Sequence, residues 1–352
     1  MTFSMIKELY AHNDWANAKI LDLCENLTDA QWDEERPQGM GTLRKTLFHI
    51  FEAERLWIER WTAAPWRAIT WDPGPMKLQD LRQLAAKNAT HRNQLLAEEE
   101  RTDFSRIVSF RNTLGKPFER RIDDLFIHVA NHGIYHRGQI LTYLKSFGRT
   151  IPGGIDYLFW KLAFPSCEQS DESVVAARQF GLEVAAGQGT APRFERDRLQ
   201  KYFGATDWAV NQVFDCCQSL DAAQLDFEFN MGMGSIRKNL QHVLDAERWW
   251  LANWKTPRSP FPRDETPRSL AELRELHQAV AVERMTFLGE QNDESATRVV
   301  EVRASGPILR FRVGESLIQL CGHHTHHRAQ TINMLRRSGV TTPETDYLYF
   351  KP

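Results

Sequence analysis

Apolar residues recur every three or four positions along most of the chain, which is the period of an amphipathic helix. The stretch 4–26 places five of them on one helix face: Ile6, Leu9, Ala16, Ile20 and Leu23. Three more stretches have the same period: 43–62, 76–99 and 121–147. Thr42 directly precedes the second stretch and is a residue type favoured at helix N-caps. The pattern therefore predicts four helices in the first part of the chain.

The second part of the chain repeats the first. The segment MGTLRKTLFHIFEAERLWIERW at 40–61 aligns with MGSIRKNLQHVLDAERWWLANW at 233–254, with 11 of 22 positions identical. DWA at 14–16 recurs at 207–209, and DYL at 156–158 recurs at 346–348. A repeat of this length predicts two copies of one fold. We expect domains at 1–163 and 193–352, joined by a linker at 164–192 that holds a short helix at 173–180.

Each copy carries one departure from the helical period. RIVSFRNTLGKPFERR at 106–121 and RVVEVRASGPILRFRV at 298–313 place β-branched residues around a Gly or Pro turn, which predicts a small hairpin. Helices at 269–289 and 314–337 complete the second copy, in which Ser235 has the place of Thr42. The fold class is thus all-α: two tandem four-helix bundles, each with a long crossover between helices 2 and 3 and a β-hairpin before helix 4.

Composition narrows the possible partners. The formal net charge is -2 with both signs interspersed, which argues against a nucleic-acid partner. No apolar run reaches the ~20 residues of a membrane span, and the first residues lack a signal-peptide pattern. The five cysteines form no CxxC pair, as is typical of a cytoplasmic protein. We expect a small-molecule substrate, and two copies that pack on each other as an intramolecular pseudo-dimer.

Two histidine motifs are duplicated. NHGIYHRGQ at 131–139 and GHHTHHRAQ at 322–330 each place histidines four residues apart, on one face of a helix. A third histidine of each copy lies in the best-matched segment. The two triads are His49, His132 and His136, and His242, His323 and His327. Three neutral imidazoles suit Zn²⁺, Ni²⁺, Cu²⁺ or Fe²⁺ and leave coordination positions open for chemistry, whereas a buried hydrogen-bond cluster is the alternative.

Other duplicated polar residues lie near these histidines in the sequence. The catalytic residues are not assigned, and the candidates are Glu52, Gln139, Asp245 and Gln330. The glutamines could hydrogen-bond a ligand histidine, and the acids could orient an imidazole or act as bases. We expect interhelical salt bridges from Glu54 to Arg137 and from Glu247 to Arg328. His326 is expected at the rim of the second site, with His324 facing elsewhere, and Tyr157 and Tyr347 are expected near the site mouths.

Three segments carry a resemblance to a known family. DWAN, GTLRKTLFHIFEAERLW and NHGIYHRGQI resemble the DinB/YfiT-like superfamily, and the resemblance covers both copies. It implies four-helix bundles with a divalent metal on three histidines, matching the two triads. Several members are metal-dependent thiol transferases or thiol-dependent isomerases that use mycothiol, bacillithiol or glutathione, and many have no assigned activity. Related domains of ergothioneine-type sulfoxide synthases carry a further domain that this chain lacks.

Three functions remain open at this point. The leading hypothesis is a metal-dependent thiol S-transferase or thiol-dependent isomerase, with Zn²⁺ or Ni²⁺ in up to one site per domain and a low-molecular-weight thiol as cosubstrate. One alternative is a non-catalytic metal-binding or stress-response protein. The other is a metal-dependent hydrolase that uses bound hydroxide.

Overall fold

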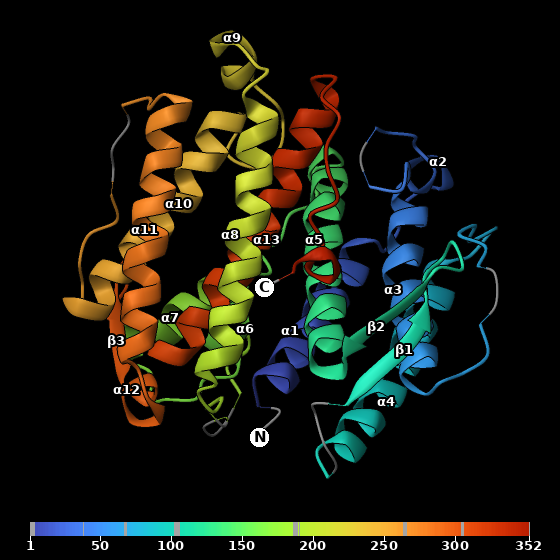
Figure 1. The fold of residues 1–352 in the computed structure, drawn as a ribbon, viewed down its shortest axis with the longest axis horizontal. Helices are drawn as coiled ribbons and strands as arrows, with labels where there is room; N and C mark the ends of the chain where they lie inside the picture. The colour runs from blue at the N-terminus through green and yellow to red at the C-terminus, as the bar shows by residue number, and fades with distance from the viewer. Residues whose placement is uncertain are drawn as a thin grey trace. The chain divides into compact units, whose positions relative to one another are not determined.

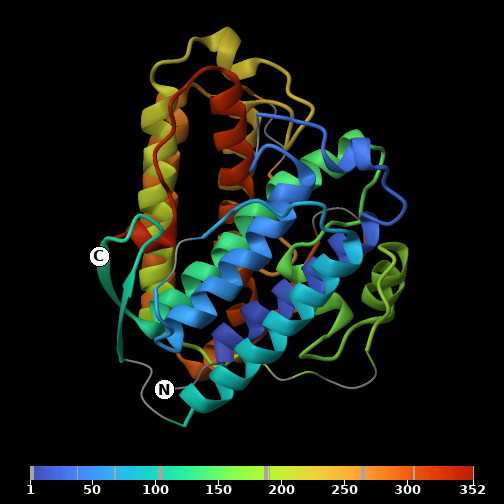
Figure 2. The ribbon, with the colours of Figure 1, turned by 90° about the vertical axis from the view of Figure 1, so that its right-hand side faces the viewer.

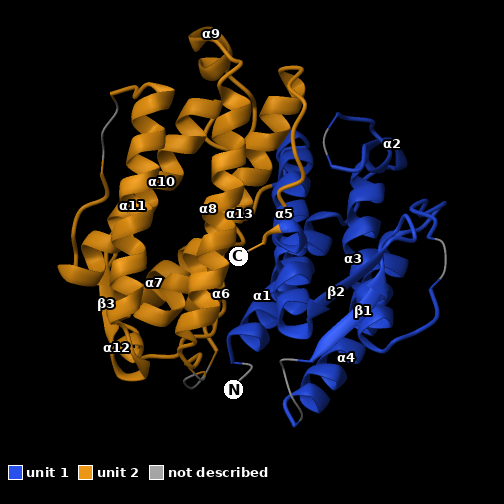
Figure 3. Cartoon of the chain, viewed as in Figure 1, with its two compact units in different colours: residues 1–149, 346–349 blue, residues 150–345, 350–352 orange. Residues whose placement is uncertain are grey.

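The chain divides into two compact units in a computed structural model (Figure 3). Unit 1 contains residues 1–149 and 346–349, and unit 2 contains residues 150–345 and 350–352. The structure describes most of both units. The described residues are 4–37, 39–66, 69–101, 106–185, 189, 191–262, 266–303 and 306–351.

Unit 1 is a four-helix bundle with a hairpin (Figure 1). Its elements are α1 (Ser4–Leu23), α2 (Asp29–Trp32), α3 (Leu43–Trp61), α4 (Leu78–Glu99), β1 (Ile107–Arg111), β2 (Pro117–Arg121), α5 (Ile122–Ser146) and the 3₁₀ helix η1 (Tyr347–Tyr349). Helices α1 and α3 each contact both α4 and α5, so the four long helices close a ring around one core (Figure 2). The first helix ends at Leu23 rather than at residue 26, where Asn26 adopts a left-handed φ of 58°.

Unit 2 repeats this arrangement. Its elements are α6 (Tyr157–Ala163), α7 (Asp171–Gln179), α8 (Arg196–Cys217), α9 (Ala222–Asp226), α10 (Ile236–Lys255), α11 (Leu270–Glu290), α12 (Asp293–Thr297), β3 (Val299–Val302), β4 (Leu309–Arg312) and α13 (Val313–Arg337). Helices α8 and α10 each contact both α11 and α13. The two bundles and their hairpins confirm the predicted fold class.

Local sequence fixes where the histidine-bearing helices begin. The hydroxyls of Thr42 and Ser235 accept hydrogen bonds from Lys45 N (3.1 Å) and Lys238 N (3.2 Å), which caps α3 and α10. Both hairpins are antiparallel, and their second strands run directly into α5 and α13. The hairpins thus set the start of the helices that carry two histidines of each triad.

The compact units do not coincide with the copies of the repeat. Residues 150–163 follow the fourth helix of the first copy but belong to unit 2, and residues 346–349 of the second copy belong to unit 1. The boundaries expected from the repeat, 1–163, 164–192 and 193–352, stay a prediction about the copies. The helix expected at 173–180 is present as α7.

Candidate metal centre

The first triad converges inside unit 1. His49 comes from α3, and His132 and His136 come from successive turns of α5. The Nε2 atoms of His49 and His132 lie 3.1 Å apart. The ring centroids of the three imidazoles are 4.9, 4.7 and 4.5 Å apart, and one ring nitrogen from each lies within 4.8 Å of the others.

The second triad has nearly the same geometry. His242 comes from α10, and His323 and His327 come from α13. Their ring centroids are 5.2, 4.7 and 4.4 Å apart, and again one nitrogen from each lies within 4.8 Å of the others. Two triangles of equal size in two units whose sequences have diverged indicate that the geometry itself has been kept.

Burial keeps the imidazoles neutral. It lowers the pKa of His49 to about 4 and that of His323 to about 3. The pKa values of His132, His136 and His327 fall well below the usual range, first through burial and then through neighbouring imidazoles. A neutral imidazole presents a lone pair, which a metal ion requires. The donor set therefore fits a divalent ion.

Amide oxygens fix one ring in each triad. The Nδ1 of His136 lies 2.7 Å from Oε1 of Gln139, and the Nδ1 of His327 lies 3.1 Å from Oδ1 of Asn239. An amide oxygen only accepts, so each Nδ1 carries the proton and each Nε2 keeps its lone pair for the triad. Asn239 was not among the residues singled out from the sequence, although it lies three positions before His242 on the same helix face.

A glycine in each copy lets a loop approach these amides. Gly39 and Gly232 have left-handed φ values of 59° and 53°. A Cβ on Gly39 would lie 2.6 Å from Oγ1 of Thr46, and one on Gly232 would lie 2.7 Å from Oδ1 of Asn239. Only glycine meets both demands, the backbone conformation and the short distance.

The remaining sequence candidates have different partners. Gln330 Nε2 lies 2.9 Å from Nε2 of His326, and the Gln330 side chain also acts on His327, as Gln139 does on His136. Glu52 forms an ion pair with Arg55. Asp245 lies 3.3 Å from Arg248 and 3.7 Å from Arg268.

His326 and Tyr135 occupy matching places beside the two triads. The His326 ring lies 5.2 Å from that of His327 at 84°, and the Tyr135 ring lies 5.2 Å from that of His136 at 84°. His326 thus lies beside the triad with its Nε2 turned to Gln330. His324 faces away from the triad and contacts the buried Glu247 carboxylate at 2.9 Å.

The expected salt bridges were assigned to the wrong arginines. Glu54 pairs with Arg92 of α4 at 2.5 Å, and Arg92 also pairs with Asp14 of α1 at 2.5 Å. In unit 2, Glu247 and Asp207 both pair with Arg284 of α11. Each arginine is fully buried and links three helices of its bundle, so it stabilises the ring of helices that holds the triad. The sequence alone does not show that an arginine of α4 or α11 reaches carboxylates on two other helices of its bundle.

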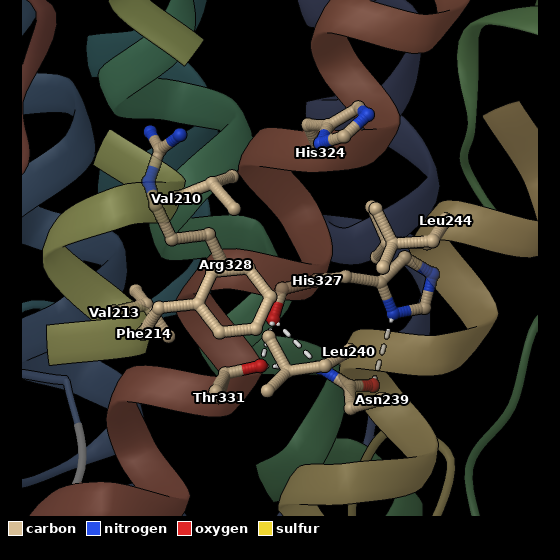
Figure 4. A pocket seen from close by; sticks show the side chains of 11 residues that line it. Val210, Val213, Phe214, Asn239, Leu240, Leu244, His324, His327, Arg328 and Thr331 are labelled. Carbon is tan, nitrogen blue, oxygen red and sulfur yellow. Dashed lines mark hydrogen bonds between the residues drawn. The ribbon is translucent and has the colours of Figure 1, made fainter. Parts of the chain in front are cut away.

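The arginines expected in those bridges are Arg137 and Arg328. Arg137 donates to Asn17 at 3.0 Å and also to Asn13. The residue at the position of Asn17 is Val210 in the second copy, and its apolar side chain cannot accept such a hydrogen bond. Figure 4 shows Arg328 extending toward Val210 in a pocket between α8, α10 and α13, with the ring of His327 turned toward Asn239 on the other side.

Aromatic rings border both triads. The Trp71 ring, from the connection between α3 and α4, lies 4.7 Å from the His49 ring. The Phe261 ring, from the connection between α10 and α11, lies 6.3 Å from the His242 ring. The long crossovers thus place one aromatic ring beside a histidine of each triad.

Both copies of the repeat are similar to known proteins. The DinB family model matches residues 1–168 and 196–352. Protein DinB of Bacillus subtilis (strain 168) is 24% identical over 150 residues, which cover 40% of this chain and 85% of that protein. No solved structure matches significantly. Among the described helices, none is long and apolar enough to cross a bilayer. Because the family model matches both copies and covers most of the chain, the chain belongs to the DinB family.

Proposed function

We propose that each triad binds one divalent ion, Zn²⁺ or Ni²⁺, and that the protein uses it to transfer or conjugate a low-molecular-weight thiol. The observation that carries the proposal is the duplicated triangle of neutral imidazoles. A bound ion would supply charge that stabilises a thiolate near neutral pH. Three protein ligands leave room for such a substrate, as in catalytic rather than structural sites.

The residues of the chain have separate parts in this proposal. His49, His132 and His136 would hold the ion in unit 1, with Gln139 fixing the His136 tautomer. Trp71 would limit water access on one side, and Tyr135 would border the other. In unit 2, Asn239 and Phe261 take the parts of Gln139 and Trp71. A dry, preorganised site stabilises a charged nucleophile better than bulk water does.

Metal content is the first test. Elemental analysis after Zn²⁺ loading and desalting should find two ions per chain, one in the His132→Ala or His323→Ala variant, and none in the double variant. The exposed His91 on α4 supplies the control, since His91→Ala should retain two. If the His132→Ala and His323→Ala variants each still bind two ions, the proposal is wrong.

Activity assays separate the proposed enzyme from its alternatives. The metal-loaded protein would be given mycothiol, bacillithiol or glutathione with a chromogenic electrophile, and separately an ester without thiol. Turnover that needs both thiol and metal supports thiol transfer. Ester hydrolysis without thiol favours a hydrolase, and tight metal binding without turnover in any assay favours a non-catalytic metal-binding protein.

A further inference from the structure

The segments that follow the fourth helix of each copy are exchanged between the compact units. Asp156, Tyr157 and Leu158 follow the first copy, and the same three residue types recur at 346–348 after the second. Unit 1, which holds the first triad, includes residues 346–349. Unit 2, which holds the second triad, includes residues 156–158. Each unit is therefore completed by a segment that belongs to the other copy.

In unit 1, the exchanged segment is anchored on the helix that carries two of the triad histidines. Tyr347 is 7% exposed, and its hydroxyl lies 3.1 Å from Oδ1 of Asp124 on α5. Asp124 precedes His132 by two helical turns, and η1 packs on α5. Asp346 directly precedes Tyr347, so this anchoring holds its backbone in unit 1, next to α5.

In unit 2, the equivalent segment is anchored on α13 by different side chains. Gln319 Nε2 donates to Oδ2 of Asp156 at 3.2 Å, and Gln319 lies one turn before His323 on α13. Lys161 of α6 and Glu315 of α13 form a 2.9 Å ion pair in which both side chains are at most 2% exposed. Asp156 occupies the N-cap position of α6, yet its side chain makes no capping hydrogen bond. Its carboxylate is turned to α13 instead.

Each triad contains an imidazole nitrogen that is available to an outer carboxylate. The Nδ1 atoms of His49 and His323 are buried and, among the described residues, have no hydrogen-bond partner. In unit 2, Gln319, which holds Asp156, lies four residues before His323 on α13. In unit 1, Tyr347 holds the segment of Asp346 on α5, the helix that carries His132 and His136.

We propose that Asp346 and Asp156 are positioning residues for the two triads, each supplied by the copy of the repeat that does not hold the triad. The proposal rests on the function proposed above. Three neutral imidazoles leave the full charge of a divalent ion uncompensated, and a nearby carboxylate in a partly dehydrated site lowers the free energy of the bound ion. Such outer carboxylates also orient ligand imidazoles, and their loss typically weakens metal binding by about tenfold to a hundredfold.

The test is a crossed set of variants in the full-length chain. Zn²⁺ affinity would be measured by competition with a chromogenic chelator, at the first triad in a His323→Ala background and at the second in a His132→Ala background. Asp346→Asn should weaken the first triad roughly tenfold or more and leave the second unchanged. Asp156→Asn should do the reverse. Glu344→Gln, which removes an exposed charge two residues before Asp346, should change neither.

Two further measurements separate a charge effect from a loss of structure. Asp346→Glu should restore most of the affinity, and the absorption spectrum of Co²⁺ at the first triad should change in Asp346→Asn but not in Glu344→Gln. Should Asp346→Asn fail to fold, Tyr347→Phe keeps the carboxylate and removes its anchor, and it should weaken the first triad alone.

The outcomes distinguish the two proposals. If Asp346→Asn binds Zn²⁺ at the first triad with wild-type affinity, the inference is wrong, although the metal sites remain. The same holds for Tyr347→Phe if Asp346→Asn does not fold. Equal losses at both triads overturn it as well, because they indicate general destabilisation. A wild-type protein that binds no divalent ion removes the proposed function, and the inference falls with it.

Discussion

Each triad combines imidazoles whose neutral form is maintained by burial with one ring whose tautomer is fixed by an amide oxygen. The first property depends on the packing of the whole bundle, whereas the second depends on one side chain. Gln139 does this for His136 and Asn239 does it for His327. Single substitutions can therefore separate the two properties.

Gln139→Leu removes the acceptor of His136 Nδ1. Because the ring then loses its fixed tautomer and orientation, Zn²⁺ affinity at the first triad should fall by about tenfold to a hundredfold. A chelator competition in the His323→Ala background measures this. The control is Gln94→Leu in the same background, which changes an exposed glutamine of α4 and should leave the affinity unchanged. Equal losses in the two variants would contradict the part assigned to Gln139.

The lowered pKa of His49 contributes to the pH dependence of the metal-free protein, together with those of the other buried triad histidines. An unfolded histidine takes up its proton near pH 6.5, whereas folded His49 does so only near pH 4. Between these values the unfolded state binds more protons, so the free energy of unfolding should fall as the pH falls, by about 1.4 kcal/mol per pH unit for one such histidine. Urea unfolding between pH 7 and 4 measures the slope.

His49→Gln removes this titration, so its slope should be shallower by about one proton. The exposed His91 serves as the comparison, and His91→Gln should leave the wild-type slope unchanged. A His49→Gln slope as steep as that of the wild type would show that His49 does not carry the effect.

At the scale of elements, the buried arginines Arg92 and Arg284 each connect three helices of a bundle through ion pairs. Arg92 joins α4 to Glu54 of α3 and to Asp14 of α1. Burial raises the pKa of Glu54, and the Arg92 charge opposes that rise. The bundle is thus closed by a charged contact as well as by apolar packing.

Arg92→Met leaves the buried Glu54 carboxylate without its cation, which typically costs about 3–5 kcal/mol of the free energy of unfolding. Arg55→Met breaks the partly exposed pairs with Glu52 and Glu59, all on one helix, and should cost about 1 kcal/mol or less. Urea unfolding of both variants at pH 7 compares the two. Similar losses would mean that the Arg92 network contributes no more than a surface pair does.

Helices, hairpins and caps could be predicted from sequence because each depends on neighbours a few residues away. The triads could be predicted because duplication marked three histidines at once. Arg92 and Asn239 could not, since their parts depend on which helices touch, and that is settled by packing rather than by period. The exchange of residues 156 and 346 was equally hidden, because a repeat shows which residues correspond and not which unit they join.

At the scale of the whole molecule, the structure holds two sites of one design in two separately compact units. A ligand that binds only the folded state stabilises it by mass action, by about 2.7 kcal/mol at a hundredfold excess over the dissociation constant. This stabilisation should therefore appear in the unit whose triad is intact.

Hydrogen–deuterium exchange with mass spectrometry can locate that stabilisation. Zn²⁺ should slow amide exchange in α3 and α5 and also in α10 and α13 of the wild-type chain. In His132→Ala it should slow exchange only in α10 and α13, and in His323→Ala only in α3 and α5. Protection of all four helices in either variant would contradict two separate sites.

The exchanged segment of unit 1 also affects the order in which the protein is made. Residues 346–349 are synthesised only after the 196 residues from 150 to 345, which at about 5–20 residues per second takes roughly 10–40 s on the ribosome. During that interval the three histidines of unit 1 have already been made while Asp346 has not. We therefore expect the nascent first bundle to hold metal more weakly than the finished one, and its triad to mature only after the second bundle has been translated.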